Sequence, residues 1–234
     1  MNAICATPHA LVHDALSCSM SQRTILVIDG HPSEHSFGHA LADAYARGAS
    51  QHATVERLAL RDLSFDLNLR SGHSREQPLE PSLVSARAMI ERASHVAWLF
   101  PYWWGGPPAL VKGFVDRVFL PGWAFKYRAD HGLPDRLLTG RSARLLVTMD
   151  SPWWWYALAY KRSIHGSFAN ATLAFVGFSP VKTRVIYKVR ELTEAQRTKV
   201  IASVADDATS DARRAPLAIT AGSTPALALP ERGA

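Results

Sequence analysis

The feature that most constrains the fold is a regular alternation of short apolar runs with longer amphipathic segments. The first run, Thr24–Asp29, has no polar alternation and ends at Gly30. Such a run is typical of a strand buried on both faces. The apolar residues that follow recur at helical spacing, at Phe37, Ala40, Leu41, Ala44 and Tyr45. This spacing predicts a helix with one buried face directly after the first strand.

The alternation continues to about residue 204. Further strands are predicted at 53–60, 95–100, 143–149 and 184–189. Further helices are predicted at 82–93, at 108–120, within 161–175 and at 193–204, where Thr193 and Gln196 are spaced as a capping box. Five strands that alternate with helices predict an α/β protein with a parallel sheet covered on both faces. Right-handed crossovers then give a doubly wound, three-layer α/β/α arrangement.

The two ends of the chain differ in composition from this middle part. Residues 1–22 show no periodicity and are predicted to be a disordered extension, with Met20 as a candidate start. Residues 206–234 are rich in Ala, Ser, Thr and Pro and are predicted to be a disordered tail. The expected domain is therefore 23–205.

Composition limits the class of protein. The two cysteines, Cys5 and Cys18, indicate neither a disulfide framework nor a thiolate metal site, which favours the cytoplasm. The longest apolar run, 96–111, is broken by proline and glycine and is not a membrane span. The net charge of +6 favours anionic ligands, while no nucleic-acid recognition motif is present.

Ligands of doubly wound sheets bind at the carboxyl ends of the strands, so the loops after strands one, three and four are the candidate site. The first loop, 30–38, offers His31 and Ser36 beside the amides at a helix N-terminus. That combination binds phosphate; simple N-capping by a serine is the alternative. A zinc site on His31, His35 and His39 is not predicted, because Pro32 interrupts their helical spacing.

The second loop is rich in aromatic residues and glycine. It reads Pro101-Tyr102-Trp103-Trp104-Gly105-Gly106. Aromatic faces suit stacking on a planar heterocycle, and glycines permit close approach of the backbone. A dimer contact or a core plug is the alternative for this loop.

The segment 100–127, FPYWWGGPPALVKGFVDRVFLPGWAFKY, resembles the signature of the flavodoxin-like NAD(P)H:quinone oxidoreductases. The matching positions are Pro101, Trp104, Pro108-Ala109, Lys112-Gly113, Asp116-Arg117-Val118-Phe119 and Gly122-Trp123-Ala124-Phe125. The first loop is similar to the same family at His31, Glu34, Ser36 and Phe37. The resemblance covers roughly three quarters of the chain and implies a flavodoxin-like fold.

The resemblance also implies a cofactor and a reaction. A flavin, FAD or alternatively FMN, is expected with its phosphate against His31, Ser36 and Phe37. Its isoalloxazine is expected against Pro101, Tyr102, Trp103, Trp104 and Gly105, with Thr148 at the end of the fourth strand. The implied enzyme is a homodimer that passes a hydride from NADPH or NADH through the flavin to a quinone or similar acceptor.

The third loop, after the fourth strand, carries the candidates for proton transfer. Some relatives place a Tyr and a His here over the bound quinone, and the corresponding pair is Tyr156 or Tyr160 with His165. Aromatic packing at a lid or dimer interface is the alternative.

Two other functions remain open at the level of sequence. One is a flavodoxin-type electron carrier, and the other is an ancillary or regulatory protein that kept the fold. Carriers of that kind are usually short and acidic, whereas the basic charge of this chain suits a polyanionic pyridine nucleotide.

Overall fold

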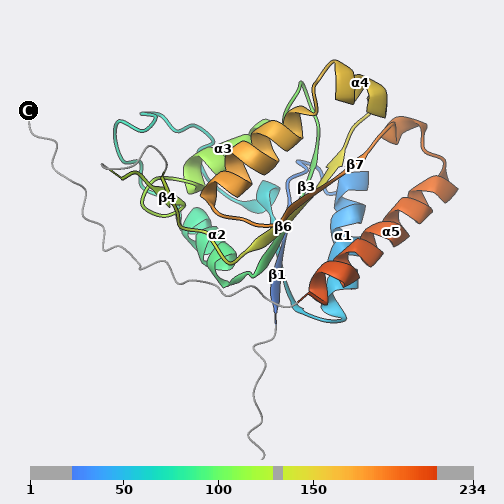
Figure 1. Cartoon of the computed structure of the whole chain (residues 1–234), viewed down its shortest axis with the longest axis horizontal. Helices are drawn as coiled ribbons and strands as arrows, with labels where there is room; N and C mark the ends of the chain where they lie inside the picture. Colours follow the sequence, from blue (N-terminus) through green and yellow to red (C-terminus); the bar gives the residue numbers. More distant parts are fainter. Residues whose placement is uncertain (1–22, 129–133, 215–234) are drawn as a thin grey trace, which may run out of the picture.

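A computed structural model describes residues 23–128 and 134–214. Its centre is a five-stranded sheet in the order β2-β1-β3-β6-β7, in which every neighbouring pair is parallel. The strands are β1 (Thr24–Asp29), β2 (Thr54–Ala59), β3 (His95–Pro101), β6 (Ser142–Thr148) and β7 (Val181–Ile186). Figure 1 shows the twisted sheet with helices on both sides. The predicted doubly wound, three-layer fold is confirmed.

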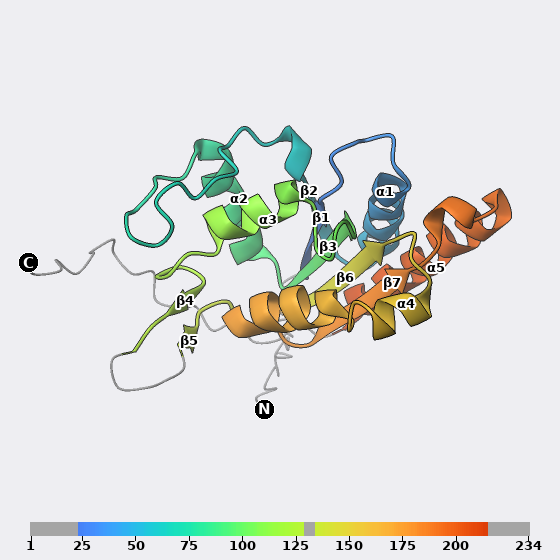
Figure 2. The ribbon, with the colours of Figure 1, turned by 90° about the horizontal axis from the view of Figure 1, so that it is seen from above.

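Two helices cover one face of the sheet. They are α1 (Phe37–Ser50) and α5 (Glu194–Ala212), which lie side by side in Figures 1 and 2. Their close approach depends on Gly48, because a Cβ there would come within 2.3 Å of the Ala205 carbonyl oxygen. The predicted capping box at the start of α5 is present, with Thr193 and Gln196 bonded to each other's backbone N–H groups.

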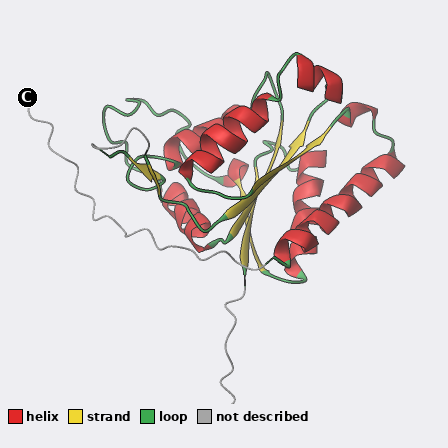
Figure 3. Ribbon diagram, viewed as in Figure 1, coloured by secondary structure: helices red, strands yellow, loops and turns green. Residues whose placement is uncertain are grey.

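The other face carries the larger core. It is covered by α2 (Pro81–Arg92), α3 (Ala109–Val118) and a π-helical segment, η2 (His165–Ala174). Figure 3 shows these helices on the side of the strands opposite α1 and α5. Trp98 of β3 is fully buried there, with its ring against Phe114 of α3 and Phe168 of η2. Burial of aromatic side chains of this size is the main favourable term in such a core.

The loop between β2 and α2 is held to the body by a buried arginine. It begins with the 3₁₀ turn η1 (Leu60–Asp62). Arg117 of α3 is fully buried and donates to Glu80 at 2.8 Å and to the carbonyls of Asp66 and Pro78. The arginine of the Asp-Arg-Val-Phe motif therefore anchors the loop.

Three predicted boundaries need correction. The last helix does not end at 204 but continues to Ala212, so the expectation that the tail starts at 206 is wrong for 206–214. Ala208, Asp211 and Ala212 are buried, and this tertiary packing outweighs the tail-like composition. The fifth strand begins at Val181, three residues before the predicted start. Residues 1–22, with Met20, and 215–234 lie outside the described residues.

Besides η1, four short elements were not predicted. They are the antiparallel pair β4 (Phe125–Lys126) and β5 (Asp135–Arg136), the helix α4 (Trp153–Leu158) and the 3₁₀ turn η3 (Val189–Glu191). The helix predicted within 161–175 is present but is π-helical over most of its length. Among the described residues, no helix is long and apolar enough to cross a membrane.

Candidate functional site

The loop between β1 and α1 is held in shape by Asp29, the last residue of β1. Its carboxylate accepts hydrogen bonds from the His31 amide (3.1 Å), from Arg61 (2.6 Å) and from the His39 ring (2.7 Å). Asp29 is 4% exposed, so these bonds also compensate a buried charge. His39 is therefore a partner of Asp29, and no cluster of three or more metal-ligating side chains occurs in the part of the chain that the structure describes.

His31 presents one ring nitrogen outward from this loop. Its Nδ1 lies 2.9 Å from the Ser33 amide nitrogen and 3.0 Å from the Ser33 carbonyl oxygen, so this nitrogen is engaged within the loop. Burial lowers the pKa of His31, against the opposing effect of the hydrogen bond to the backbone of Ser33. Nε2 is therefore the ring nitrogen that can meet a ligand.

Ser36 and Phe37 open α1. Ser36 is the N-cap, and its Oγ accepts the His39 amide at 3.0 Å. The capping alternative for Ser36 is thus observed, but its hydroxyl proton remains available as a donor. The first amides of a helix have no partner within the helix. The amides of Phe37 and Gly38 are therefore available to a ligand at the helix start, beside the Ser36 hydroxyl. The guanidinium of Arg197 lies 4.9 Å from the centre of the Phe37 ring and adds positive charge.

The loop after β3 forms a tight turn that leaves one tryptophan uncovered. Trp103 and Gly106 exchange backbone hydrogen bonds of 2.9 and 3.0 Å. The two residues between them, Trp104 and Gly105, have φ values of +50° and +85°. Glycine adopts such angles freely, whereas tryptophan does so rarely and at a cost. The Trp104 side chain is fully exposed, so both of its faces are open to a ligand or another chain.

The loops after β1, β3 and β6 meet at one edge of the sheet. The rings of His31 and Trp103 are in edge contact, with 6.0 Å between centroids. The Tyr102 amide donates to the carbonyl of Thr148, the last residue of β6, at 2.8 Å. Pro101 is paired with Thr148 in the sheet register, so the second loop leaves from the same level as the third.

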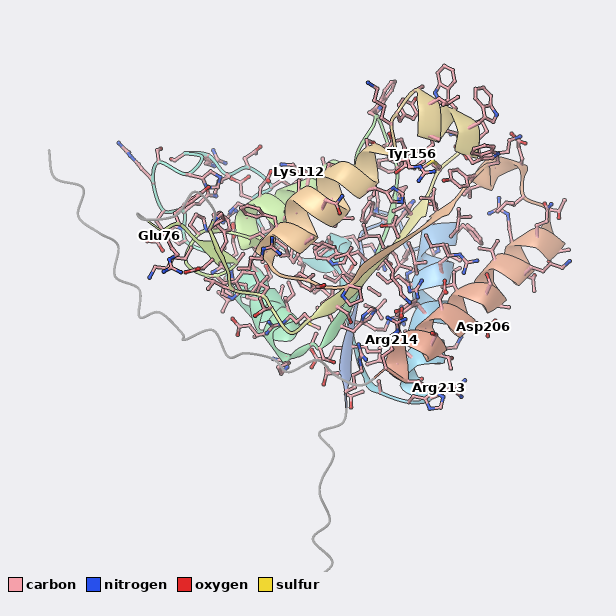
Figure 4. All side chains as sticks on the ribbon, in the orientation of Figure 1. Glu76, Lys112, Tyr156, Asp206, Arg213 and Arg214 are labelled. Atoms are coloured by element: carbon pink, nitrogen blue, oxygen red, sulfur yellow. The ribbon has the colours of Figure 1, made fainter. Side chains whose placement is uncertain are left out.

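Tyr156 and His165, nine residues apart, lie together in the structure. The Tyr156 hydroxyl is 3.0 Å from Nδ1 of His165. Tyr156 belongs to α4, and Figure 4 shows it beneath that helix, near the carboxyl end of the sheet. It is 1% exposed, and burial raises its pKa to about 12. Burial, assisted by the charge of Arg162, lowers the pKa of His165. Near neutral pH the pair is therefore a protonated phenol hydrogen-bonded to a neutral imidazole.

Tyr160 is the other tyrosine considered as a partner of His165, but the hydrogen bond to His165 is made by Tyr156. Its ring packs on Tyr102 and Trp155. Aromatic packing is therefore the observed arrangement for Tyr160, while Tyr156 has the hydrogen bond to His165.

Several residues of the site were not predicted from the sequence. Asp29 and Arg61 shape the first loop, and Ser163 contacts the second. Asp29 was detectable in principle, because it is the only charged residue of the first apolar run and ends it. Arg61 lies in a polar loop and Ser163 within the segment 161–175 predicted to contain a helix, and only the tertiary structure brings them to this edge.

A doubly wound sheet with three loops gathered at one carboxyl edge defines the class of α/β proteins in which that edge is the usual place for a ligand. Residues 23–210 match the protein family described as having a flavodoxin-like fold. This chain belongs to that family.

Two curated proteins are similar to this chain at 28% and 24% sequence identity. NAD(P)H dehydrogenase (quinone) 1 from Cavia porcellus is 28% identical over 135 residues, which are 55% of this chain and 47% of that protein. The match therefore spans about half of that relative. A protein from Haemophilus influenzae named uncharacterized NAD(P)H oxidoreductase is 24% identical over 185 residues, 75% of this chain and 89% of its own.

Solved structures support the same fold. Smu.1420 from Streptococcus mutans is 26% identical, with a TM-score of 0.70 over 80% of this chain and 99% of its own. A Bacillus anthracis FMN-dependent NADH-azoreductase in complex with FMN has a TM-score of 0.64 at 15% identity, and covers 81% of this chain and 99% of its own. At that identity the likeness concerns the fold alone.

Proposed function

We propose that the protein is a flavin-dependent NAD(P)H oxidoreductase that reduces a quinone or a similar small acceptor. The observation that carries the proposal is the meeting of three loops at one edge of the sheet. The His31–Trp103 ring contact joins the first two loops, and the Tyr102–Thr148 hydrogen bond joins the last two. An anion-binding helix start, an uncovered aromatic turn and a Tyr–His pair are thereby placed around one edge. The names of the two curated relatives agree with this function.

The residues at this edge fit a flavin. The His31 imidazole, the Ser36 hydroxyl and the first amides of α1 would hold its phosphate. The left-handed turn at Trp104 and Gly105 exposes an aromatic face. Bound there, a flavin would supply the two-electron redox chemistry that the protein side chains lack.

FAD is proposed over FMN because a guanidinium lies beside the first loop, where it could meet the second phosphate of a diphosphate. Arg197 is partly buried over Phe37 and is fixed by its bond to the Val189 carbonyl at 2.7 Å. NADPH or NADH is the proposed hydride donor.

The chain's own residues would manage the proton that accompanies reduction of the acceptor. Tyr156 keeps its hydroxyl proton at neutral pH and could give it to a bound oxygen. His165 would then pass its Nδ1 proton to the Tyr156 oxygen and take up a proton from solvent at Nε2. The exposed aromatic side chains at the same edge would exclude water once a planar ligand covers them. They are Trp103, Trp104, Trp153, Trp154, Trp155 and Tyr160.

A homodimer and a cytoplasmic location are part of the proposal. Several exposed aromatic side chains near one edge are typical of an interface. A second copy placed over it would close the site. The cytoplasmic location rests on the low cysteine content.

The test is anaerobic mixing of the purified protein with NADPH or NADH. We expect the protein to be yellow, to release FAD on denaturation, and to be bleached directly by a pyridine nucleotide in a two-electron step. Quinone should then restore the colour, with parallel lines in a double-reciprocal plot. Protein that takes up neither FAD nor FMN would contradict the proposal. Bleaching only through a separate reductase and a stable semiquinone would make the chain an electron carrier.

A further inference from the structure

The hydroxyl of Ser163 joins the turn after β3 to the segment that follows α4. Its Oγ donates to the Gly105 carbonyl at 2.9 Å and lies 2.8 Å from the Tyr102 hydroxyl. Lys161 and Arg162, just before it, have φ values of +46° and +52°. The backbone thus makes a sharp turn that brings Ser163 toward the loop 102–106.

The direction of the hydrogen bonds follows from counting protons. A serine hydroxyl has one proton, and that of Ser163 is used on the Gly105 carbonyl. Its contact with Tyr102 must therefore be a bond in which the tyrosine donates. Burial raises the pKa of Tyr102, so this phenol keeps its proton at neutral pH. The result is a chain of hydrogen bonds that runs from the Tyr102 hydroxyl through the Ser163 hydroxyl to the Gly105 carbonyl.

This chain of hydrogen bonds fixes the plane of the peptide unit between Gly105 and Gly106, which closes the turn. The Gly105 carbonyl belongs to the same peptide unit as the Gly106 amide, which donates to the Trp103 carbonyl at 3.0 Å. With both sides of the unit bonded, the plane cannot rotate without loss of two hydrogen bonds. The left-handed angles at Trp104 and Gly105, which are unfavourable for the tryptophan, are thereby maintained.

We infer that Ser163 is a positioning residue that holds the Trp104–Gly105 turn in the shape that receives the flavin ring. The inference rests on the proposed function for the identity of the ligand. The hydrogen-bond chain also sets Tyr102 apart from Tyr156. The Tyr102 proton is directed through Ser163 to a backbone carbonyl, which cannot take it up, whereas Tyr156 faces an imidazole that can.

The test compares Ser163→Ala with Ser163→Thr, which keeps the hydroxyl, and with Ser85→Ala as a control. Ser85 is exposed in α2, and its Oγ bonds only to the Pro81 carbonyl of its own helix. Flavin would be removed and FAD titrated back while its fluorescence is followed. We expect Ser163→Ala to raise the Kd for FAD about tenfold, or ~1.4 kcal/mol. The threonine and Ser85 variants should bind within a factor of two of the unaltered protein.

Hydrogen exchange of the flavin-free proteins supplies a second readout that needs no ligand. Amides of 103–106 should exchange faster in Ser163→Ala, and Tyr102→Phe should show the same change in smaller degree. In the double variant the effects on exchange should not add, because both changes break one chain of bonds. If the Ser163→Ala variant does not fold, the Tyr102→Phe and Ser163→Thr variants still test the chain of hydrogen bonds.

Two results would overturn the inference: an unaltered Kd and unaltered exchange in Ser163→Ala, or loss of affinity in Ser163→Thr equal to that in Ser163→Ala. A protein that binds no flavin at all, but whose turn exchanges faster in Ser163→Ala, would instead contradict the proposed function. In that case the serine would still hold the turn.

Discussion

At the scale of the residue, the arrangement of Tyr156 and His165 makes a prediction about proton transfer. Replacement of His165 by Ala should slow the oxidation of reduced protein by quinone by about 10²-fold or more, the usual effect of a lost general acid–base group. Flavin content should not change, because the hydrogen-bond partners of His165 within the described structure, Tyr156 and the Arg162 carbonyl, lie outside the loops at 30–38 and 101–106. Stopped-flow measurement of the re-oxidation is the appropriate assay.

The pH dependence of the same step gives a control. The pKa of His165 is lowered from 6.5 by burial and by the charge of Arg162. The imidazole is therefore neutral at pH 7 and becomes protonated, hence a stronger proton donor, only as pH falls below 6.5. Re-oxidation should speed up in that range, and this acceleration should be absent from His165→Ala. It should persist in His73→Ala, which alters an exposed histidine of the loop before α2. An unchanged acceleration in His165→Ala would assign it to another group.

At the scale of the element, the end of α5 is fixed by a buried carboxylate. Asp211 is 1% exposed, accepts from the Tyr45 hydroxyl at 2.8 Å and is paired with Arg144. Burial opposes its ionisation, but the hydrogen bonds from Arg144 hold the pKa of Asp211 below its ordinary value. Asp211→Ala would leave Arg144 buried without this partner, so we expect a loss of about 3–5 kcal/mol in the free energy of unfolding.

The matched control lies on the same helix. Asp206 is exposed on α5 and is labelled in Figure 4. Asp206→Ala should change the free energy of unfolding by no more than about 0.5 kcal/mol. Urea denaturation followed by circular dichroism would compare the two. Equal stability of both variants would mean that the last turn of α5 contributes nothing to the fold.

At the scale of the whole molecule, a buried polar network links four elements at the amino ends of the strands. Ser142 of β6 lies 2.8 Å from Nδ1 of His95 in β3, and Nε2 of His95 lies 2.9 Å from the Tyr45 hydroxyl of α1, which donates to Asp211 of α5. Because that tyrosine proton is used on Asp211, His95 must donate from Nε2 and accept at Nδ1. The ring is therefore neutral in the folded protein.

This network predicts sensitivity to acid. Burial lowers the pKa of His95 to about 3, against the opposing charge of Asp211, whereas an unfolded histidine titrates near 6.5. Between those values the unfolded chain binds a proton that the folded chain does not. The stabilisation is therefore complete above pH 6.5 and is lost progressively as pH falls toward 3, by a few kcal/mol. Thermal melts from pH 8 to pH 4 would measure this loss. His95→Gln should flatten the profile between pH 6.5 and 5, and an equally steep profile would exclude His95 as its source.

The sequence by itself determined the order of strands and helices, the parallel sheet and the loops that carry the site. These follow from local periodicity, as at Thr24–Asp29, and from the rule that parallel strands end at one edge. The tertiary structure decided what depends on contacts between distant residues. It extended α5 to Ala212, because Asp211 meets Arg144 across 67 positions of sequence. It also brought Tyr156 to His165, and Ser163 to Gly105, through turns with left-handed angles at residues such as Lys161 and Arg162. Neither glycine nor periodicity marks those turns, so no local pattern predicts them.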